Sequence, residues 1–347
     1  MMRDGFFGVA GRTVMSALCM VLTVAAATGA AMGATTGDAI GAEPQPAVSL
    51  VFAGDIVLDG QPGKAIEQGR DPFAAFAAIL DNADIRVGNL ECVVATVGDA
   101  EDKIFNFRAH PRTLDVLKRH FDAVSVANNH SGDFGRSAFA EMLGLLDRQG
   151  ILRFGGGRNL SEAHAPLIIE RKGIRIALLG YNEFMPRSFE ADADAPGTAW
   201  SEDEQVVADI RKARSVYGAD VVIPIMHWGW ENEEQASTRQ RQLAHLMIDA
   251  GADAVIGGHP HVTQNIEDYR GKLIVYSVGN FMIDALDNEA QTIGWVVRLQ
   301  LDRNGVKSWS TRVAHIDAEG IPHPAPSANS PCGVRGRDGN GICGNED

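Results

Sequence analysis

The chain has 347 residues, of which 31 are Lys or Arg and 45 are Asp or Glu, so its formal net charge is −14. This acidic balance argues against a nucleic-acid-binding protein, because such a surface needs clustered basic side chains over the phosphates. It does not exclude a small or localised anionic substrate, because bound cations can reverse the local electrostatic field.

Residues 1–34 have the pattern of a secretory signal peptide. Arg3 and Arg12 precede an apolar stretch over residues 14–27, and small residues follow it. The stretch is shorter than the about 20 apolar residues of a membrane-spanning helix. We therefore expect cleavage and a periplasmic or extracellular protein, with an uncleaved N-terminal membrane anchor as the alternative. Residues 35–47 are small, polar and Pro-containing, which predicts a linker before a main domain over 48–318.

Seven short apolar runs predict strands that are buried on both faces. They are residues 48–53, 85–87, 123–126, 174–179, 221–226, 254–256 and 273–277. Helical patterns lie between them, over residues 74–80, 112–119, 138–149, 202–217 and 237–250. This alternation of strands and helices predicts an α/β layered fold.

Two further apolar runs, 295–301 and 309–314, flank Asn304-Gly305, which predicts a β-hairpin. Residues 319–347 are rich in Pro and Gly, and we expect a loop-like tail there. Cys332 and Cys343 lie close together in this tail, which in an oxidising compartment predicts a disulfide. Cys92 stands alone in the sequence, and we expect it to be a buried free thiol.

Polar side chains follow six of the predicted strands at the point where each strand ends. The segments are Gly54-Asp55, Gly88-Asn-Leu-Glu91, Ala127-Asn-Asn-His130, His227-Trp-Gly-Trp-Glu231, Gly257-Gly-His-Pro-His261 and Gly279-Asn-Phe281. In open α/β sheets the carboxyl ends of the strands share one crevice, where ligands bind. We therefore expect these six segments to converge on one site.

Some of these residues have structural explanations as well as functional ones. Asp55 could cap a turn, and Asn89 could satisfy loop backbone. Glu91 lies among apolar residues, so its charge needs a cation or a hydrogen-bond donor. His259-Pro-His261 in an extended segment would point both imidazoles the same way. Imidazole and carboxylate together are typical ligands of Mn, Zn or Fe.

Arg108 lies in the segment Phe105-Asn-Phe-Arg-Ala-His-Pro111. It could hold a substrate anion through two hydrogen bonds, or it could form a surface salt bridge. The neighbouring tryptophans of the fourth strand-end segment, Trp228 and Trp230, are expected to be packing residues or pocket walls.

At the strand-end motifs the sequence resembles the bacterial CapA family of capsule and poly-γ-glutamate biosynthesis, within the calcineurin-like metallophosphoesterase superfamily. The resemblance covers roughly residues 48–300. It implies a four-layer α-β-β-α sandwich. It also implies association with the synthesis or export of an anionic γ-linked glutamate polymer at the cell envelope.

The resemblance also implies roles for individual residues. His130 would lie near the substrate, and a set of carboxylate, amide and imidazole groups would bind one or two divalent metal ions: Asp55, Glu91, Asn129, His227, His259 and His261. Substrate contacts or supporting hydrogen bonds would come from Asn89, Asn128, Glu231 and Asn280, to which the chemistry of Arg108 described above adds a further candidate. The chain departs from the superfamily pattern because Ile56 and Val57 follow Asp55, where an Asp-x-His motif is usual. The bridging position is offered by Glu91, or by Asn89, in place of the usual Asp, so the number of metal ions stays open.

Three functions are compatible with these residues. The first is a metal-dependent hydrolase acting on a phosphoester, an amide or a polymer chain. The second is a non-catalytic envelope accessory protein that binds an anionic polymer or the membrane synthesis and export machinery. The third is an extracellular phosphoesterase or nucleotidase.

Overall fold

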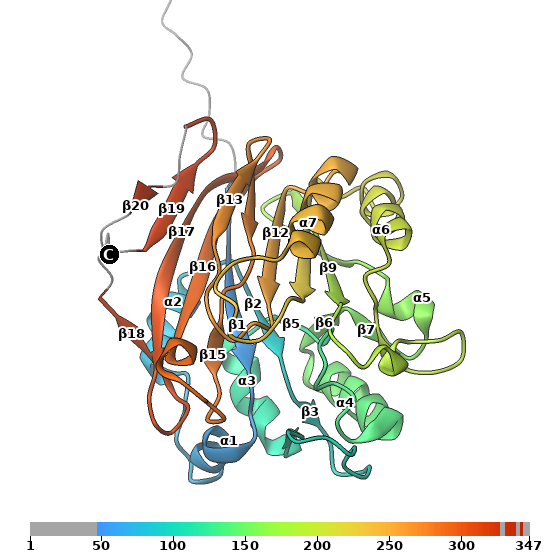
Figure 1. The fold of residues 1–347 in the computed structure, drawn as a ribbon, viewed down its shortest axis with the longest axis vertical. Helices are drawn as coiled ribbons and strands as arrows, with labels where there is room; N and C mark the ends of the chain where they lie inside the picture. The colour runs from blue at the N-terminus through green and yellow to red at the C-terminus, as the bar shows by residue number, and fades with distance from the viewer. Residues whose placement is uncertain (1–46, 327–329, 338–340, 343–347) are drawn as a thin grey trace, which may run out of the picture. The chain divides into compact units, whose positions relative to one another are not determined.

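The computed structural model describes residues 47–326, 330–337 and 341–342 (Figure 1). The predicted signal peptide, nearly all of the predicted linker and Cys343 lie outside these residues, so the Cys332–Cys343 disulfide stays a prediction. Within the described ranges, no helix combines the length and apolar character needed to cross a membrane.

Sheet 1 is a ten-stranded mixed sheet. Its strand order is β20-β19-β17-β16-β1-β2-β5-β6, with β15 paired to β1 and β18 paired to β17. The parallel part consists of β1 (Val48–Ile56), β2 (Ile85–Leu90), β5 (Ala123–Ser125), β6 (Leu152–Phe154) and β15 (Asn280–Met282). The antiparallel part consists of β16 (Ile293–Asp302), β17 (Gly305–Ile316), β18 (Pro322–Ala325), β19 (Pro331–Val334) and β20 (Gly341–Ile342).

Sheet 2 has six strands in the order β13-β14-β12-β11-β9-β8. Their bounds are β8 (Leu167–Arg171), β9 (Ile174–Asn182), β11 (Val221–His227), β12 (Ala254–Gly258), β13 (Ile266–Tyr269) and β14 (Lys272–Val275). Two small two-stranded sheets pair β3 (Val93–Val94) with β4 (Arg108–Ala109), and β7 (Gly156–Gly157) with β10 (Gly197–Thr198).

Seven α-helices lie in the described residues. They are α1 (Gly60–Glu67), α2 (Ala77–Asp81), α3 (Leu114–His120), α4 (Gly135–Gln149), α5 (Leu160–Ala163), α6 (Asp203–Ser215) and α7 (Thr238–Ala250). Short 3₁₀ turns cover Ala74–Phe76, Pro111–Thr113, Arg187–Phe189 and Glu289–Thr292. Helix α7 begins with a capping box, in which Ser237 and Gln240 satisfy each other's backbone N–H groups.

Three apolar cores separate four layers. Alternate residues of β1 enter different cores, because successive strand side chains point to opposite faces. Val51 packs towards α2, α3 and α4, whereas Phe52 packs between the two sheets against β9 and β11. On the far side of sheet 2, Val222 packs with residues of α6 and α7. The predicted α-β-β-α sandwich is therefore confirmed.

All seven predicted strands, the hairpin and the five predicted helices are present. Several strands run one to three residues further than predicted, because the polar segments at their ends continue the pairing. The expectation of a loop-like tail over 319–347 is wrong in part, since β18 and β19 pair with β17. Proline cannot donate to a ladder, but β18 tolerates Pro322 and Pro324 because it pairs on one side only, with β17.

Candidate metal centre

The strand-end segments of the two sheets meet at one place. Asp55 is the next-to-last residue of β1, Glu91 directly follows β2, and His227 ends β11. The His259–His261 segment follows β12, and Asn280 begins β15, which pairs with β1 at Asp55. All of these strands except β15 have their carboxyl ends at the site. The side chains therefore lie close together because the strand ends converge there.

Two groups of ligand-type side chains overlap in this cluster. One group is Glu91, His227 and His259, and the other is Asp55, Glu91 and His261. Within each group the candidate ligand atoms lie within 4.8 Å of one another. Glu91 belongs to both groups, which is the arrangement expected of a carboxylate between two cations.

A metal ion fits these residues because the cluster holds polar atoms that nothing else satisfies. Both carboxylate oxygens of Glu91 are buried and have no hydrogen-bond partner in the described structure. A buried unsatisfied polar group costs on the order of 1–3 kcal/mol, and a charged one costs more. Nitrogen and oxygen donors of this kind suit Mn, Zn or Fe.

Asn129 and His227 bring further donors to the first group. His227 Nε2 lies 2.6 Å from Asn129 Oδ1, 3.1 Å from His259 Nδ1 and 3.3 Å from Glu91 Oε1. Four ligand-type atoms from four segments therefore converge around one point.

Three asparagines hold the ligands in place. Asn89 Nδ2 donates to Asp55 Oδ1 at 2.7 Å, and Asn128 Nδ2 donates to Asn89 Oδ1 at 3.0 Å. His261 Nδ1 lies 2.8 Å from Asn280 Oδ1. Such partners orient ligand side chains and set the imidazole tautomer.

The backbone around the two histidines differs from the extended segment that we predicted. His259 has φ 94° and His261 has φ 59°, both in the left-handed region that residues other than glycine rarely adopt. As a result the two rings join different ligand groups. Backbone strain of this kind clusters at functional sites, where the surrounding structure maintains it.

Burial and neighbouring charges shift the protonation of the cluster. Burial raises the pKa of Glu91 well above its ordinary value, and the charge of Asp55 adds to this. Burial lowers the pKa of His227 to about 4 and also lowers that of His259. For His261 burial acts in the same direction, but the Glu91 and Asp55 carboxylates outweigh it and raise the pKa. His227 and His259 are therefore neutral at pH 7, the form that binds metals.

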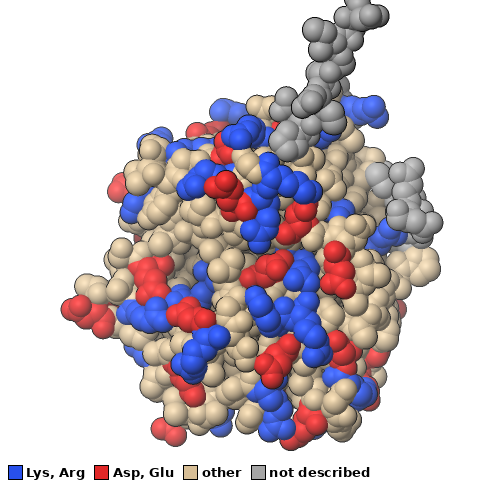
Figure 2. Space-filling model, turned by 180° about the vertical axis from the view of Figure 1, so that it is seen from behind, with Lys and Arg blue, Asp and Glu red and all other residues tan. Residues whose placement is uncertain are grey.

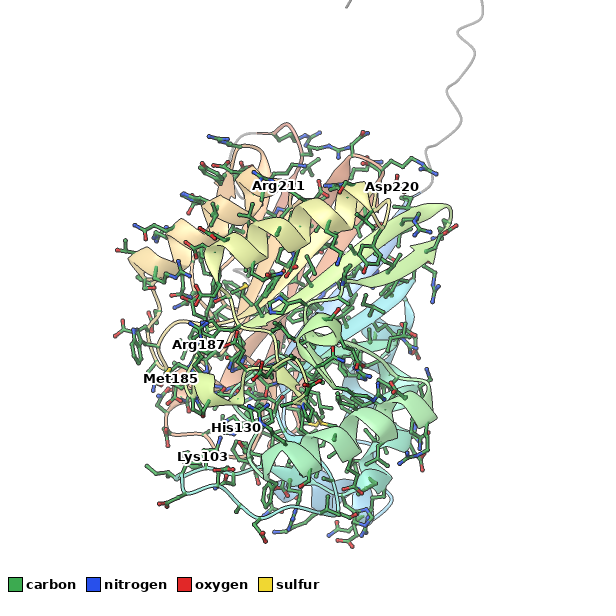
Figure 3. All side chains as sticks on the ribbon, turned by 90° about the vertical axis from the view of Figure 1, so that its right-hand side faces the viewer. Lys103, His130, Met185, Arg187, Arg211 and Asp220 are labelled. Atoms are coloured by element: carbon green, nitrogen blue, oxygen red, sulfur yellow. The ribbon has the colours of Figure 1, made fainter. Side chains whose placement is uncertain are left out.

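His130 has a partner that the sequence reasoning missed. Its Nδ1 lies 2.8 Å from Oδ2 of the buried Asp133, which also forms an ion pair with Lys103 and accepts a hydrogen bond from Phe107 N (Figure 3). In this arrangement Nδ1 is protonated and donates to Asp133, and Nε2 is the ring nitrogen that does not contact Asp133. Burial lowers the pKa of His130, although Asp133 opposes this effect. The spacing of His130 and Asp133, three residues apart, was the available signal.

Aromatic side chains flank the cluster. The Phe107 ring lies 4.6 Å from the His130 ring, and the Phe184 ring lies 3.8 Å from the His259 ring. Trp230 packs edge-on against Phe184 and is 67% exposed. Trp228 is buried and donates to the Tyr276 carbonyl, so it is a packing residue.

Glu231 belongs to neither ligand group. The Arg108 guanidinium lies 4.2 Å from the centre of the Phe134 ring and donates to the Gly98 carbonyl. Glu231 is exposed. Cys92 is a buried free thiol, as predicted, and burial raises its pKa.

Comparison with known proteins gives matches over most of the chain. The family model described as "Bacterial capsule synthesis protein PGA_cap" matches residues 49–285. The PGA biosynthesis protein CapA of Bacillus subtilis is 33% identical over 290 residues, covering 80% of this chain and 73% of the relative. The capsule biosynthesis protein CapA of Bacillus anthracis is 28% identical, covering 81% and 70%. Among solved structures, Haemophilus influenzae NAD nucleotidase has a TM-score of 0.43 and 12% identity, covering 81% of this chain and 54% of that chain, a likeness too weak to support an argument.

Proposed function

The chain belongs to the bacterial capsule synthesis protein family. From this membership, from the buried ligand cluster and from the signal-peptide pattern of residues 1–34, we propose that it is an exported metal-dependent hydrolase acting in poly-γ-glutamate capsule synthesis. Its substrate would be the anionic polymer or a phosphoester, and its partners would include the membrane synthesis or export machinery. The observation that carries the hydrolase proposal is the shared position of Glu91, whose two oxygens are buried without hydrogen bonds.

The ligands would be Asp55, Glu91, Asn129, His227, His259 and His261, holding one or two ions of Mn, Zn or Fe. When bound, such ions lower the pKa of a coordinated water and polarise the bond to be cut. The asparagines Asn89 and Asn280 keep the ligand side chains oriented.

His130 is the proton donor in this proposal. Asp133 accepts the hydrogen bond from Nδ1–H and would stabilise the doubly protonated ring, whose Nε2–H faces away from Asp133 and would be the proton given to the leaving group. Phe107 and Phe184 cover the rings of His130 and His259 and limit the access of bulk water to them.

The test combines elemental analysis with an activity assay on the purified protein. We expect bound transition metal, and Mn²⁺-dependent turnover of a generic phosphodiester or of a γ-glutamyl oligomer. His130→Ala should keep the metal and lose turnover, whereas His259→Ala should lose both. His323→Ala is the matched control, because that histidine is exposed and pairs with Asp317.

Two outcomes would contradict the proposal. One is equal turnover by the wild type and His130→Ala. The other is a protein without transition metal whose stability does not change in His259→Ala; this second result would favour a non-catalytic accessory protein. Export is tested separately, by locating the protein in cell fractions and sequencing its N-terminus.

A further inference from the structure

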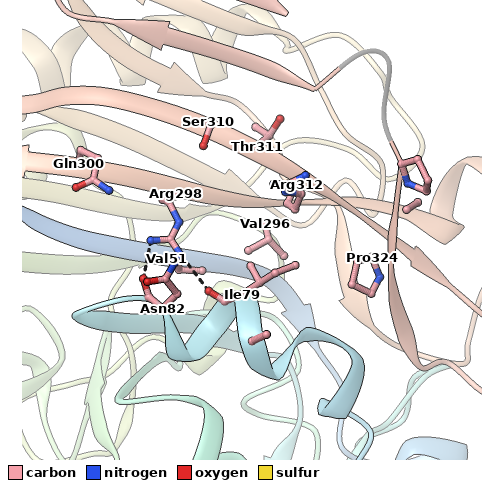
Figure 4. A pocket seen from close by; sticks show the side chains of 13 residues that line it. Val51, Ile79, Asn82, Val296, Arg298, Gln300, Ser310, Thr311, Arg312 and Pro324 are labelled. Atoms are coloured by element: carbon pink, nitrogen blue, oxygen red, sulfur yellow. Dashed lines mark hydrogen bonds between the residues drawn. The ribbon is translucent and has the colours of Figure 1, made fainter. Parts of the chain in front are cut away.

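A groove of about 660 Å³ lies on the helix-covered face of sheet 1, away from the strand ends (Figure 4). It is bounded by α2, by β16 and β17, and by residues 324–326. Val51 of β1 lines the groove, and Asp55 of the metal centre follows four residues later on the same strand. At the rise of an extended strand, the two positions are about 13 Å apart.

Two arginines face this groove. In the β16–β17 ladder Val296 lies opposite Arg312, and Arg298 lies opposite Ser310. The two arginines are therefore diagonal neighbours on one face of the sheet. Both line the groove, and none of the thirteen lining residues is acidic. By contrast, basic and acidic side chains are interspersed over the face of the molecule that Figure 2 shows.

The Arg298 guanidinium is held in a fixed orientation. Its Nη1 donates to the Asn82 carbonyl at 2.8 Å, and its Nη2 donates to the Ile79 carbonyl at 3.0 Å. A guanidinium carries five N–H groups, so three remain for a ligand. Within the described ranges, no carboxylate lies within 4.0 Å of Arg298.

Burial and neighbouring charges act on Arg298 in opposite directions. Burial lowers its pKa, the charge of Arg312 lowers it further, and the more distant Asp84 opposes these effects. The Asp84 carboxylate is itself engaged by Lys172 Nζ at 2.7 Å and by Ser49. An anion placed beside Arg298 would offset the effect of the Arg312 charge on it.

We propose that this groove, which we call the arginine groove, binds a polycarboxylate chain as a second contact away from the metal centre. Arginines bind carboxylates through paired hydrogen bonds, and Gln300 and Ser310 supply further polar groups. Ala78, Ile79 and Pro324, which are exposed or partly exposed, form apolar walls that fit the methylene groups between successive carboxylates. This inference rests on the proposed function, because a γ-linked glutamate polymer is a chain of this chemical class.

The test measures binding of a fluorescent oligo-γ-glutamate to the full chain by anisotropy, with a chelator present so that metal ions do not contribute. We expect Arg312→Glu and Ser310→Asp each to weaken binding about tenfold or more. Ser310→Asp places a negative charge opposite Arg298 without removing either arginine. Arg211→Glu is the matched control for Arg312→Glu, because it makes the same change of net charge at an exposed residue of α6, in another layer (Figure 3); it should bind like the wild type.

The inference is supported if Arg312→Glu and Ser310→Asp both lose binding while Arg211→Glu binds like the wild type. Equal binding by all variants, or no binding by the wild type, would overturn it. Displacement of the oligomer by inorganic polyphosphate at lower concentration than by free oligo-γ-glutamate would also overturn the assignment to carboxylates. Metal content and phosphodiester turnover of Arg312→Glu are measured separately, so failure of the groove and failure of the metal centre can be told apart.

Discussion

Replacing Glu91 by glutamine should stabilise the metal-free protein and remove its stabilisation by metal. In the folded chain burial and Asp55 raise the pKa of Glu91 above its ordinary 4.5. The folded state therefore keeps a proton that the unfolded state releases, and stability is lost as the pH rises above about 4.5. Between pH 4.5 and pH 7 the loss is about 1.4 kcal/mol for each pH unit over which Glu91 stays protonated only in the folded state. Glutamine does not ionise, so the variant escapes most of it.

Urea unfolding at pH 7 measures both parts of this prediction. With a chelator present, Glu91→Gln should unfold at higher urea concentration than the wild type. At a metal concentration of 100 times the dissociation constant, the wild type should gain about 2.7 kcal/mol and the variant almost nothing. Glu231→Gln, at an exposed site, should change neither value. If the metal-free Glu91→Gln protein is less stable than the wild type, or gains as much from metal, the reasoning is refuted.

Three further predictions concern the residues around Glu91. As the pH falls from 6.5 to about 4, His227 should contribute a loss of about 3 kcal/mol to the stability of the metal-free protein, opposite in sign to the Glu91 contribution, because unfolded His227 takes up a proton that the buried ring does not; the difference in unfolding between the wild type and His227→Gln measures this contribution. Asp133→Asn should lower turnover about a hundredfold with metal content unchanged in elemental analysis, because His130 loses its orienting acceptor. In Gly258→Ala the new Cβ would lie 3.0 Å from Asp55 Oδ1, so metal titration should show about tenfold weaker binding, whereas Gly144→Ala in α4 should bind normally.

The sequence was sufficient to predict which segments meet. Continuous apolar runs identify strands that are buried on both faces, and parallel strands end at one edge of a sheet, so Asp55 and His227 could be expected to converge. The sharing of Glu91 by two ligand groups could not be predicted in the same way. It depends on how the ends of β11 and β12 lie against those of β1 and β2, and this follows from packing between two sheets.

The local sequence pattern also gave wrong or incomplete predictions where contacts with distant residues determine the backbone conformation or the role of a side chain. The left-handed backbone of His259 and His261 is maintained by surrounding contacts, such as the bond from His259 N to Asp55 Oδ2. Asp133 acquires its role from Lys103 and Phe107, which lie in a separate loop. The strands of the tail form because β17 offers them an edge, which the composition of the tail does not reveal.

β1 pairs with β16, which lies beyond the region that the family model matches. The matched region is therefore shorter than the part of the chain needed for folding. The family match ends at residue 285, yet β16 begins at Ile293 and pairs with β1 along Val48–Phe52. Val297, Leu299 and Leu301 of β16 also belong to the core between the sheets. A chain cut at the end of the matched region would leave the central strand with an open apolar edge, which invites intermolecular pairing. Boundaries drawn by homology would in this case yield an aggregating fragment, although every proposed metal ligand would still be present.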